Sequence, residues 1–291
     1  MTSERYRVRC GILPIQKHKA EHWRLVLMPP IPQTLLDCSV YLYPTKEAAE
    51  AGERFGGSGF LFSVPVEGHE EGWVTLYVVT NRHVLDQGGR FIRVNKIDGG
   101  THVIETQRYD WADHSQRYDV AAYSLDLEAS VVQFASLFPD HLITREVIAD
   151  WDLRPGDEAF LVGRLITPWG QQRNVPAVRF GNISMMADPS EPAIGYENVL
   201  REAFLVECRS LSGFSGSPVF CSTTRRYDWD GKMPTPLLGQ PRYTKHRRYP
   251  LPAPEGTFGP WLLGIDWGHL PLWRPVYTTK SFDYPKAQAL R

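Results

Sequence analysis

The 291-residue sequence lacks any apolar run near the roughly 18 residues that a membrane-spanning helix needs. Residues 1–6 are polar and charged, unlike the beginning of a secretory signal peptide. We therefore expect a cytoplasmic protein that has no membrane partner.

Cysteine is scarce, and the four residues Cys10, Cys38, Cys208 and Cys221 match no metal-binding spacing. The sequence thus predicts neither a metal site nor a bound cofactor. A reducing compartment keeps cysteines as thiols, so we expect buried free thiols at positions 208 and 221, with a disulfide between them as the alternative.

An excess of charge of either sign is also missing, because 32 basic and 33 acidic residues give a formal net charge of −1. Such a balance excludes a general attraction to nucleic acid or to anionic membranes. The basic residues of the proline-rich stretch 222–260 lack the accompanying stripe or aromatic motif of a nucleic-acid binder. Protein partners are therefore expected.

Short β-type segments, by contrast, are abundant, and the 24 glycines and 23 prolines supply turns between them. Alternating or β-branched runs predict strands over 39–43, 60–64, 73–80, 91–94, 102–104, 119–124, 158–162, 178–183, 203–207, 218–221 and 261–266. A short helix is predicted over 46–51.

One hexapeptide carries a chemical signal: residues 213–218 read Gly-Phe-Ser-Gly-Ser-Pro between two apolar strands. Its glycines allow a sharp turn in which amide groups converge on an anion while the Ser215 hydroxyl stays exposed. A serine between glycines is also common in ordinary turns. An α/β-hydrolase elbow is disfavoured, because Ser217 occupies its last glycine position and no helix-forming run follows.

Two further residues stand at the edges of β-type segments upstream of this turn. The predicted strand 73–80 delivers His83 at its end, and histidine is the side chain best suited to accept a serine proton near neutral pH. Asp119 directly precedes an apolar strand, where a partly buried carboxylate needs a partner such as an imidazole N–H. Taken singly, each residue has an ordinary structural interpretation; their joint occurrence favours a triad.

His83, Asp119 and Ser215 follow in the order found in trypsin-like serine peptidases of the chymotrypsin fold, which this sequence resembles. It looks most similar to bacterial cytoplasmic and high-temperature-requirement-like members. The usual Gly-Asp-Ser-Gly-Gly-Pro is changed here at Phe214 and Ser217. The resemblance rests on the stretches 57–60 (Gly-Ser-Gly-Phe), 80–85 (Thr-Asn-Arg-His-Val-Leu), 119–122 (Asp-Val-Ala-Ala), 213–219 and 263–265 (Leu-Gly-Ile).

This resemblance implies an all-β fold of two six-stranded antiparallel barrels with the active site in the cleft between them. The expected units are an N-terminal extension over 1–35, a first barrel over 36–140, and a second barrel over 141–291 with the basic, proline-rich insertion at 222–260. Protein or peptide is then the expected substrate, with a regulatory protein as a further partner.

The same resemblance implies roles for individual residues. His83 acts as the base, Asp119 orients it, Ser215 attacks the peptide carbonyl, and the amides of Gly213 and Ser215 form the oxyanion hole. Arg209, six residues before the nucleophile, corresponds to the base of the specificity pocket and would favour acidic substrate side chains. The segment with Asp266 and Trp267, near the opposite wall, offers an acidic group that would favour basic ones. Pocket preference therefore stays open. A latent or non-catalytic module that binds a protein in its cleft is the alternative function.

Overall fold

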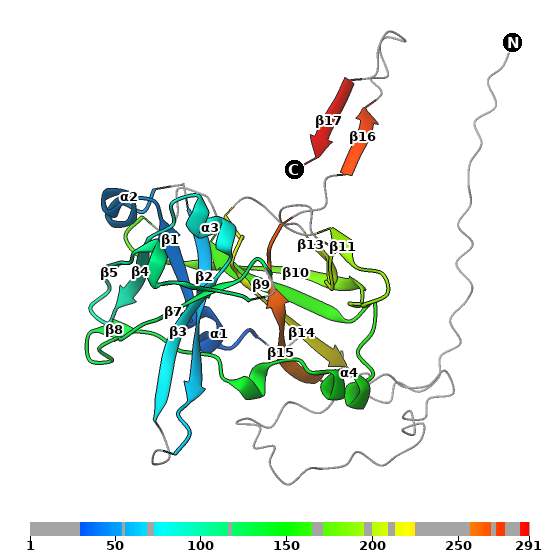
Figure 1. Cartoon of the computed structure of the whole chain (residues 1–291), viewed down its shortest axis with the longest axis horizontal. Helices are drawn as coiled ribbons and strands as arrows, with labels where there is room; N and C mark the ends of the chain where they lie inside the picture. The colour runs from blue at the N-terminus through cyan, green and yellow to red at the C-terminus, as the bar shows by residue number, and fades with distance from the viewer. Residues whose placement is uncertain are drawn as a thin grey trace, which may run out of the picture.

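Two antiparallel β-sheets lie side by side, and the helices between their strands are short (Figure 1). The computed structural model describes residues 30–53, 56–68, 73–115, 118–164, 171–194, 200–208, 213–224, 257–268, 272–276 and 286–290. The first large sheet is built from residues 39–133 and the second from residues 158–265.

The first sheet has the strand order β5-β4-β1-β2-β3-β7-β6, with β8 paired to β4. Its strands are β1 (Ser39–Tyr43), β2 (Gly57–Pro65), β3 (Val74–Thr80), β4 (Phe91–Lys96), β5 (Thr101–Glu105), β6 (Ala112–Asp113), β7 (Ala121–Ser124) and β8 (Val132–Gln133). Strand β3 ends just before the candidate site residue His83, and its neighbour β7 begins just after the candidate site residue Asp119.

The second sheet has the order β13-β10-β9-β14-β15. Its strands are β9 (Glu158–Arg164), β10 (Pro176–Met185), β13 (Leu205–Cys208), β14 (Pro218–Thr224) and β15 (Thr257–Ile265). Two small hairpins pair β11 (Ala193–Ile194) with β12 (Leu200–Arg201), and β16 (Leu272–Val276) with β17 (Lys286–Leu290).

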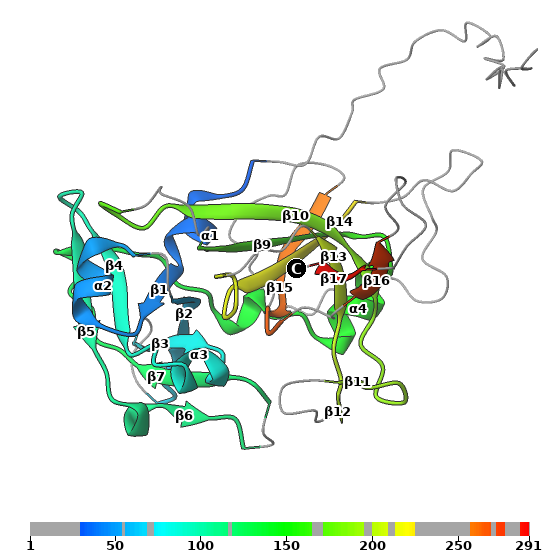
Figure 2. The same ribbon diagram turned by 90° about the horizontal axis from the view of Figure 1, so that it is seen from above.

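The helical segments are all short. They are α1 (Gln33–Asp37), α2 (Lys46–Ala51), α3 (Arg82–Asp86), α4 (Arg145–Trp151) and the 3-10 turns η1 (Arg108–Asp110) and η2 (Pro139–His141). The predicted helix 46–51 is confirmed as α2, which lies beside β4 and β5 (Figure 2). It begins at Thr45, whose side chain accepts the Ala48 N–H, and ends at the left-handed Gly52.

Strand β9 shows how the core is arranged, because alternate side chains on a strand point to opposite faces. Ala159 and Leu161 pack into the core of the second sheet, whereas Phe160 and Val162 belong to a cluster shared with the first sheet. This shared cluster consists of Leu35, Cys38, Phe60, Leu137, Phe160, Val162, Phe220 and Leu262, and we call it the inter-sheet core. A separate core fills the first sheet.

The predicted all-β, antiparallel architecture is confirmed, but the strand count differs. The described residues form one sheet of eight strands and one of five, instead of six in each unit. Two members of the larger sheet, β6 and β8, are only two residues long, and so short a strand leaves no alternation pattern in the sequence. Within the described residues, none of the helices has the length and apolar character that a bilayer crossing requires.

Candidate active site

His83 lies in the one-turn helix α3, immediately after strand β3 ends at Thr80. The predicted strand end is therefore present, and the helix that follows it was not predicted. The His83 side chain is 12% exposed, so it is largely covered but still accessible. This combination suits a group that must exchange protons with a bound molecule.

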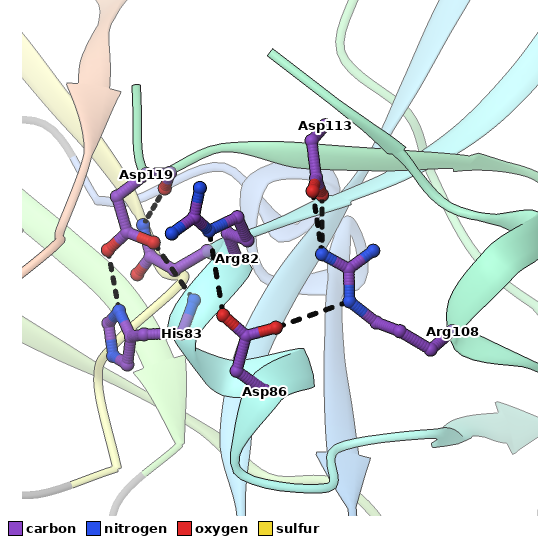
Figure 3. A network of polar contacts seen from close by, with 7 residues as sticks. Arg82, His83, Asp86, Arg108, Asp113 and Asp119 are labelled. Atoms are coloured by element: carbon purple, nitrogen blue, oxygen red, sulfur yellow. Dashed lines mark hydrogen bonds and ion pairs between the residues drawn. The ribbon is translucent and has the colours of Figure 1, made fainter. Parts of the chain in front are cut away.

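Asp119 uses both oxygens of its carboxylate to bind His83 (Figure 3). The His83 backbone N–H donates to Oδ1 at 2.9 Å, and the imidazole Nδ1 lies 2.5 Å from Oδ2. With a residue exposure of 9%, the carboxylate is buried and needs such partners to offset its desolvation. The contact fixes the orientation of the ring relative to the backbone.

Asn81 adds a third tie between the same two segments. It is fully buried, and its side-chain amide donates to the Asp119 carbonyl oxygen at 2.7 Å. As the residue preceding α3 it would ordinarily cap the helix, but its side chain makes no capping hydrogen bond. Sequence reasoning missed this role; an asparagine two residues before the histidine was the available signal.

Ser215 occupies a tight turn between two glycines in the left-handed region, Gly213 with φ +100° and Gly216 with φ +88°. The turn is closed by the Ser217 N–H, which donates to the Phe214 carbonyl at 2.8 Å. Only glycine adopts such φ values without strain, so the turn depends on this residue pattern. Ser215 itself is partly exposed.

The Ser215 turn is held against the first sheet, close to the segment that leads to His83. The Ser58 N–H on β2 donates to the Ser215 carbonyl at 2.9 Å. A methyl group on Gly216 would collide with the Ser58 carbonyl oxygen and with Thr80 Oγ1. Since Thr80 is three residues before His83, the two segments meet in space although 132 residues separate His83 from Ser215 in the chain.

The two departures from the usual nucleophile motif lie beneath this turn. Phe214 is fully buried in the core of the second sheet, and the Arg179 guanidinium lies over its ring at 5.8 Å from the centroid. Ser217 is also fully buried, so tightly that a methyl group on Gly163 of β9 would collide with its hydroxyl. Phe214 thus supports the turn by packing instead of by charge.

The three candidate pocket residues differ in where the structure places them. The Asp266 backbone pairs with the Ser215 turn, accepting from the Gly216 N–H and donating to the Ser217 carbonyl, each at 2.9 Å. Trp267 lines a cavity of about 260 Å³ that Asp119 also borders, together with Phe204, Val219 and Ile265. Arg209 lies outside the described residues, so the pocket base predicted for it is not part of this description.

A chain of charged groups extends from α3 to neighbouring segments (Figure 3). Arg82 and Arg108 both contact the Asp86 carboxylate, at 3.5 and 3.3 Å, and Arg108 continues to Asp113 at 2.7 Å. These carboxylates raise the pKa of the Arg108 guanidinium, with Asp113 as the main cause. The network connects the helix that carries His83 to η1 and β6.

Cys38, Cys208 and Cys221 are free thiols. Burial raises the pKa of both Cys38 and Cys221 to about 12, and it also raises that of Cys208, with a further contribution from nearby Asp266. Such thiols stay protonated at neutral pH and are poor nucleophiles. Among the described residues, no three His, Cys, Asp or Glu side chains gather where they could hold a metal ion.

The trypsin-like peptidase domain family matches residues 57–226, which include β2, His83, Asp119 and Ser215. Among solved structures, the inactive form of the Rv3671c protease is similar to 69% of this chain and 75% of its own, with 16% sequence identity and a TM-score of 0.36. No curated protein matches the chain in sequence.

Proposed function

Because this chain belongs to the trypsin-like peptidase domain family, we propose that it is a serine endopeptidase that cleaves peptide bonds of protein substrates through an acyl-enzyme. The observation that carries the proposal is the pairing of His83 Nδ1 with Asp119 Oδ2, at 2.5 Å, beside the turn that presents Ser215. An imidazole anchored in this way is oriented for proton transfer.

In the proposed mechanism, the Nδ1–H of His83 donates a hydrogen bond to the Asp119 carboxylate, which leaves Nε2 as the basic atom. Ser215 Oγ attacks the peptide carbonyl carbon while its proton moves to Nε2. The tetrahedral intermediate then expels the amine, which takes the proton from His83. Water repeats the sequence on the acyl-enzyme and releases the acid. Asp119 stabilises the imidazolium and stays ionised.

The oxyanion of each tetrahedral intermediate is proposed to bind the amide groups of Gly213 and Ser215. The left-handed φ of Gly213 and the turn-closing bond from Ser217 to Phe214 support this arrangement, because they give successive peptide planes different orientations. Donors of this kind are typically worth about 3–4 kcal/mol each in the transition state.

Substrate binding is proposed at the cavity beside Asp119. Most of its lining side chains are apolar, among them Phe204, Leu263 and Trp267, and Arg201 and Glu202 add charge. An apolar side chain of a protein substrate fits such a lining, and a protein substrate agrees with a peptidase family.

A peptide library derived from digested cell protein tests this function without knowledge of the physiological substrate. Native protein should generate new peptide ends, detected by mass spectrometry, whereas Ser215→Ala should lower the rate by roughly 10⁴-fold or more. Asp119→Asn should lower it by about 10⁴-fold, because the histidine then takes the wrong tautomer.

Ser222→Ala is the matched control, since Ser222 is a buried serine on β14 seven residues beyond Ser215. It should cleave like native protein. Cleavage that persists in Ser215→Ala would refute the triad. No cleavage by well-folded native protein would instead favour a latent enzyme or a module that only binds protein.

A further inference from the structure

Ser58 stands at the beginning of β2, in the Gly-Ser-Gly-Phe segment of residues 57–60, and is fully buried. Although it belongs to the first sheet, its closest polar partners lie on other segments of the chain. A buried hydroxyl needs hydrogen-bond partners, and those of Ser58 lie on the nucleophile turn and on β9.

Two bonds from Ser58 reach the nucleophile turn. Its backbone N–H donates to the Ser215 carbonyl at 2.9 Å, and its hydroxyl donates to the Gly213 carbonyl at 2.8 Å. One residue thus holds the carbonyl groups on both sides of Phe214 and Ser215. The hydroxyl bond spans 155 sequence positions.

Two further bonds hold Ser58 itself in place. Its carbonyl accepts the Thr80 hydroxyl at 2.7 Å, and its Oγ accepts the Arg164 backbone N–H of β9 at 3.0 Å. Because the Arg164 N–H occupies a lone pair of Oγ, the hydroxyl hydrogen is directed toward its other partner, the Gly213 carbonyl. Ser58 therefore joins β3, β9 and the nucleophile turn.

These bonds constrain three successive peptide planes. The carbonyls of Gly213 and Ser215 accept from Ser58, and the Phe214 carbonyl between them accepts from the Ser217 N–H. In a trans peptide the N–H points away from the C=O of the same plane, so fixing the Phe214 carbonyl also directs the Ser215 N–H. The two anchored neighbours keep that plane from rotating.

We propose that Ser58 is a positioning residue for acyl transfer: its hydroxyl holds the Gly213 carbonyl and so keeps the nucleophile turn in the conformation that presents the oxyanion donors. The inference rests on the proposed serine-peptidase function and adds to it a residue that touches neither the scissile carbonyl nor His83. Loss of the hydroxyl removes the hydrogen bonds to the Gly213 carbonyl and from the Arg164 N–H, and frees the turn.

The test measures inactivation by a small alkyl fluorophosphonate, in which Ser215 Oγ forms a bond to phosphorus and fluoride leaves. Ser58→Ala should lower the maximal inactivation rate by roughly 10- to 100-fold, the range expected when reacting groups are displaced by about 1 Å. The half-saturating probe concentration should not change, because probe binding is not altered.

Ser63→Ala is the matched control. Ser63 is another buried serine on β2, and its hydroxyl bonds to Ser136 at 2.7 Å, away from the nucleophile turn. Both variants should lower the urea midpoint of unfolding to a similar extent, whereas only Ser58→Ala should slow inactivation. Ser58→Cys, which keeps the volume but weakens the hydrogen bond, provides a second variant if the alanine form does not fold.

The outcomes separate the two claims. Equal inactivation rates for native protein, Ser58→Ala and Ser63→Ala would overturn the positioning role while leaving the serine-peptidase proposal intact. A native protein that folds but does not react would overturn the proposed function itself, and the role of Ser58 with it. A slower rate confined to the Ser58 variants would support both.

Discussion

The tripeptide from Asn81 to His83 binds Asp119 at three atoms. The Asn81 side-chain amide donates to the Asp119 backbone carbonyl, while the backbone N–H and the imidazole ring of His83 bind the two carboxylate oxygens of Asp119. Because these three groups belong to residues 81–83, one short segment sets both the position and the rotation of the Asp119 carboxylate. Orientation of the imidazole is therefore decided largely at the scale of single residues.

Asn81→Ala removes the donor to the Asp119 carbonyl and leaves that buried group unsatisfied. We expect the free energy of unfolding to fall by about 1–3 kcal/mol and peptide cleavage to fall by about tenfold in kcat, with KM unchanged. Steady-state kinetics and urea unfolding would measure both.

Asn95→Ala is the control for this change. Asn95 also exchanges buried hydrogen bonds with its partner, Asn174, but on β4, outside the candidate site. It should lose stability without the fall in kcat. An equal loss of kcat in both variants would contradict a specific role for Asn81.

The buried thiols predict a loss of stability at high pH. Cys38 and Cys221 have pKa values of about 12 in the folded protein, above the ordinary value of 9.0, so the unfolded chain releases their protons first. Their contribution to stability is complete below about pH 9 and is lost as the pH rises toward 12.

Urea unfolding at pH 8, 10 and 11 should therefore give falling midpoints for native protein. A double variant, Cys38→Ala with Cys221→Ala, should start from a lower midpoint and decline less steeply. The same steepness in both proteins would show that other groups cause the alkaline loss.

Candidate site residues could be predicted from the sequence where neighbouring residues form a recognisable pattern. The histidine at a strand end, the carboxylate before a strand and the serine between glycines each left a recognisable pattern. The family resemblance then implied the contact between His83 and Asp119 that the structure contains. The role of Ser58 was not predictable, because its partners Gly213 and Arg164 lie more than 100 residues away and no local pattern specifies them.

At the scale of elements, helix α3 is a single turn of five residues, too short to be stable alone. Strand β3 precedes it, and the contacts of Asp86 with Arg82 and Arg108 tie its end to η1 and β6 (Figure 3). The helix that carries His83 is thus held from both ends.

Arg108→Gln removes the bridge between Asp86 and Asp113. The Arg108 side chain is 34% exposed, so solvent screens its ion pairs, and we expect a loss of less than about 1 kcal/mol that shrinks further at high salt. Thermal unfolding at low and high sodium chloride measures this difference.

A matched comparison is Lys96→Gln, which removes an ion pair with Asp98 at 2.7 Å on the far end of β4. Both variants should show small salt-dependent losses, but only Arg108→Gln should reduce cleavage. A large, salt-independent loss in Arg108→Gln would mean that the side chain acts mainly through packing.

The sequence predicted most of the longer strands and helix α2, and it missed the shortest elements as well as the seven-residue helix α4. Strands such as β3 and β9 carry five or more residues of clear β-forming character, and α2 begins with Thr45 and ends before Gly52. Helix α3 and strands β6 and β8 span too few residues for a periodic pattern, and tertiary contacts decide their conformation.

At the scale of the whole molecule, the candidate triad draws His83 and Asp119 from one sheet and Ser215 from the other. The inter-sheet core, in which Phe160 and Phe220 of the second sheet cluster with Phe60 of the first, holds these sheets together. The geometry of the site therefore depends on apolar packing that lies outside it.

Phe160→Ala should destabilise the protein by about 3–5 kcal/mol and reduce cleavage, because it opens a cavity between the sheets. Phe180→Ala is the control: its ring lies 6.1 Å from that of Phe160 but is 54% exposed, so it should cost far less. Calorimetry should show one transition in native protein. Similar losses in both variants would contradict a stabilising inter-sheet core.

The central claim is that this molecule assembles an activated Ser215, and intact mass after treatment with a fluorophosphonate tests it most directly. Native protein should gain the mass of one adduct, Ser215→Ala should gain none, and near-ultraviolet circular dichroism should show that both are folded. A folded native protein that gains no adduct, or a Ser215→Ala variant that gains the same one, would contradict the account.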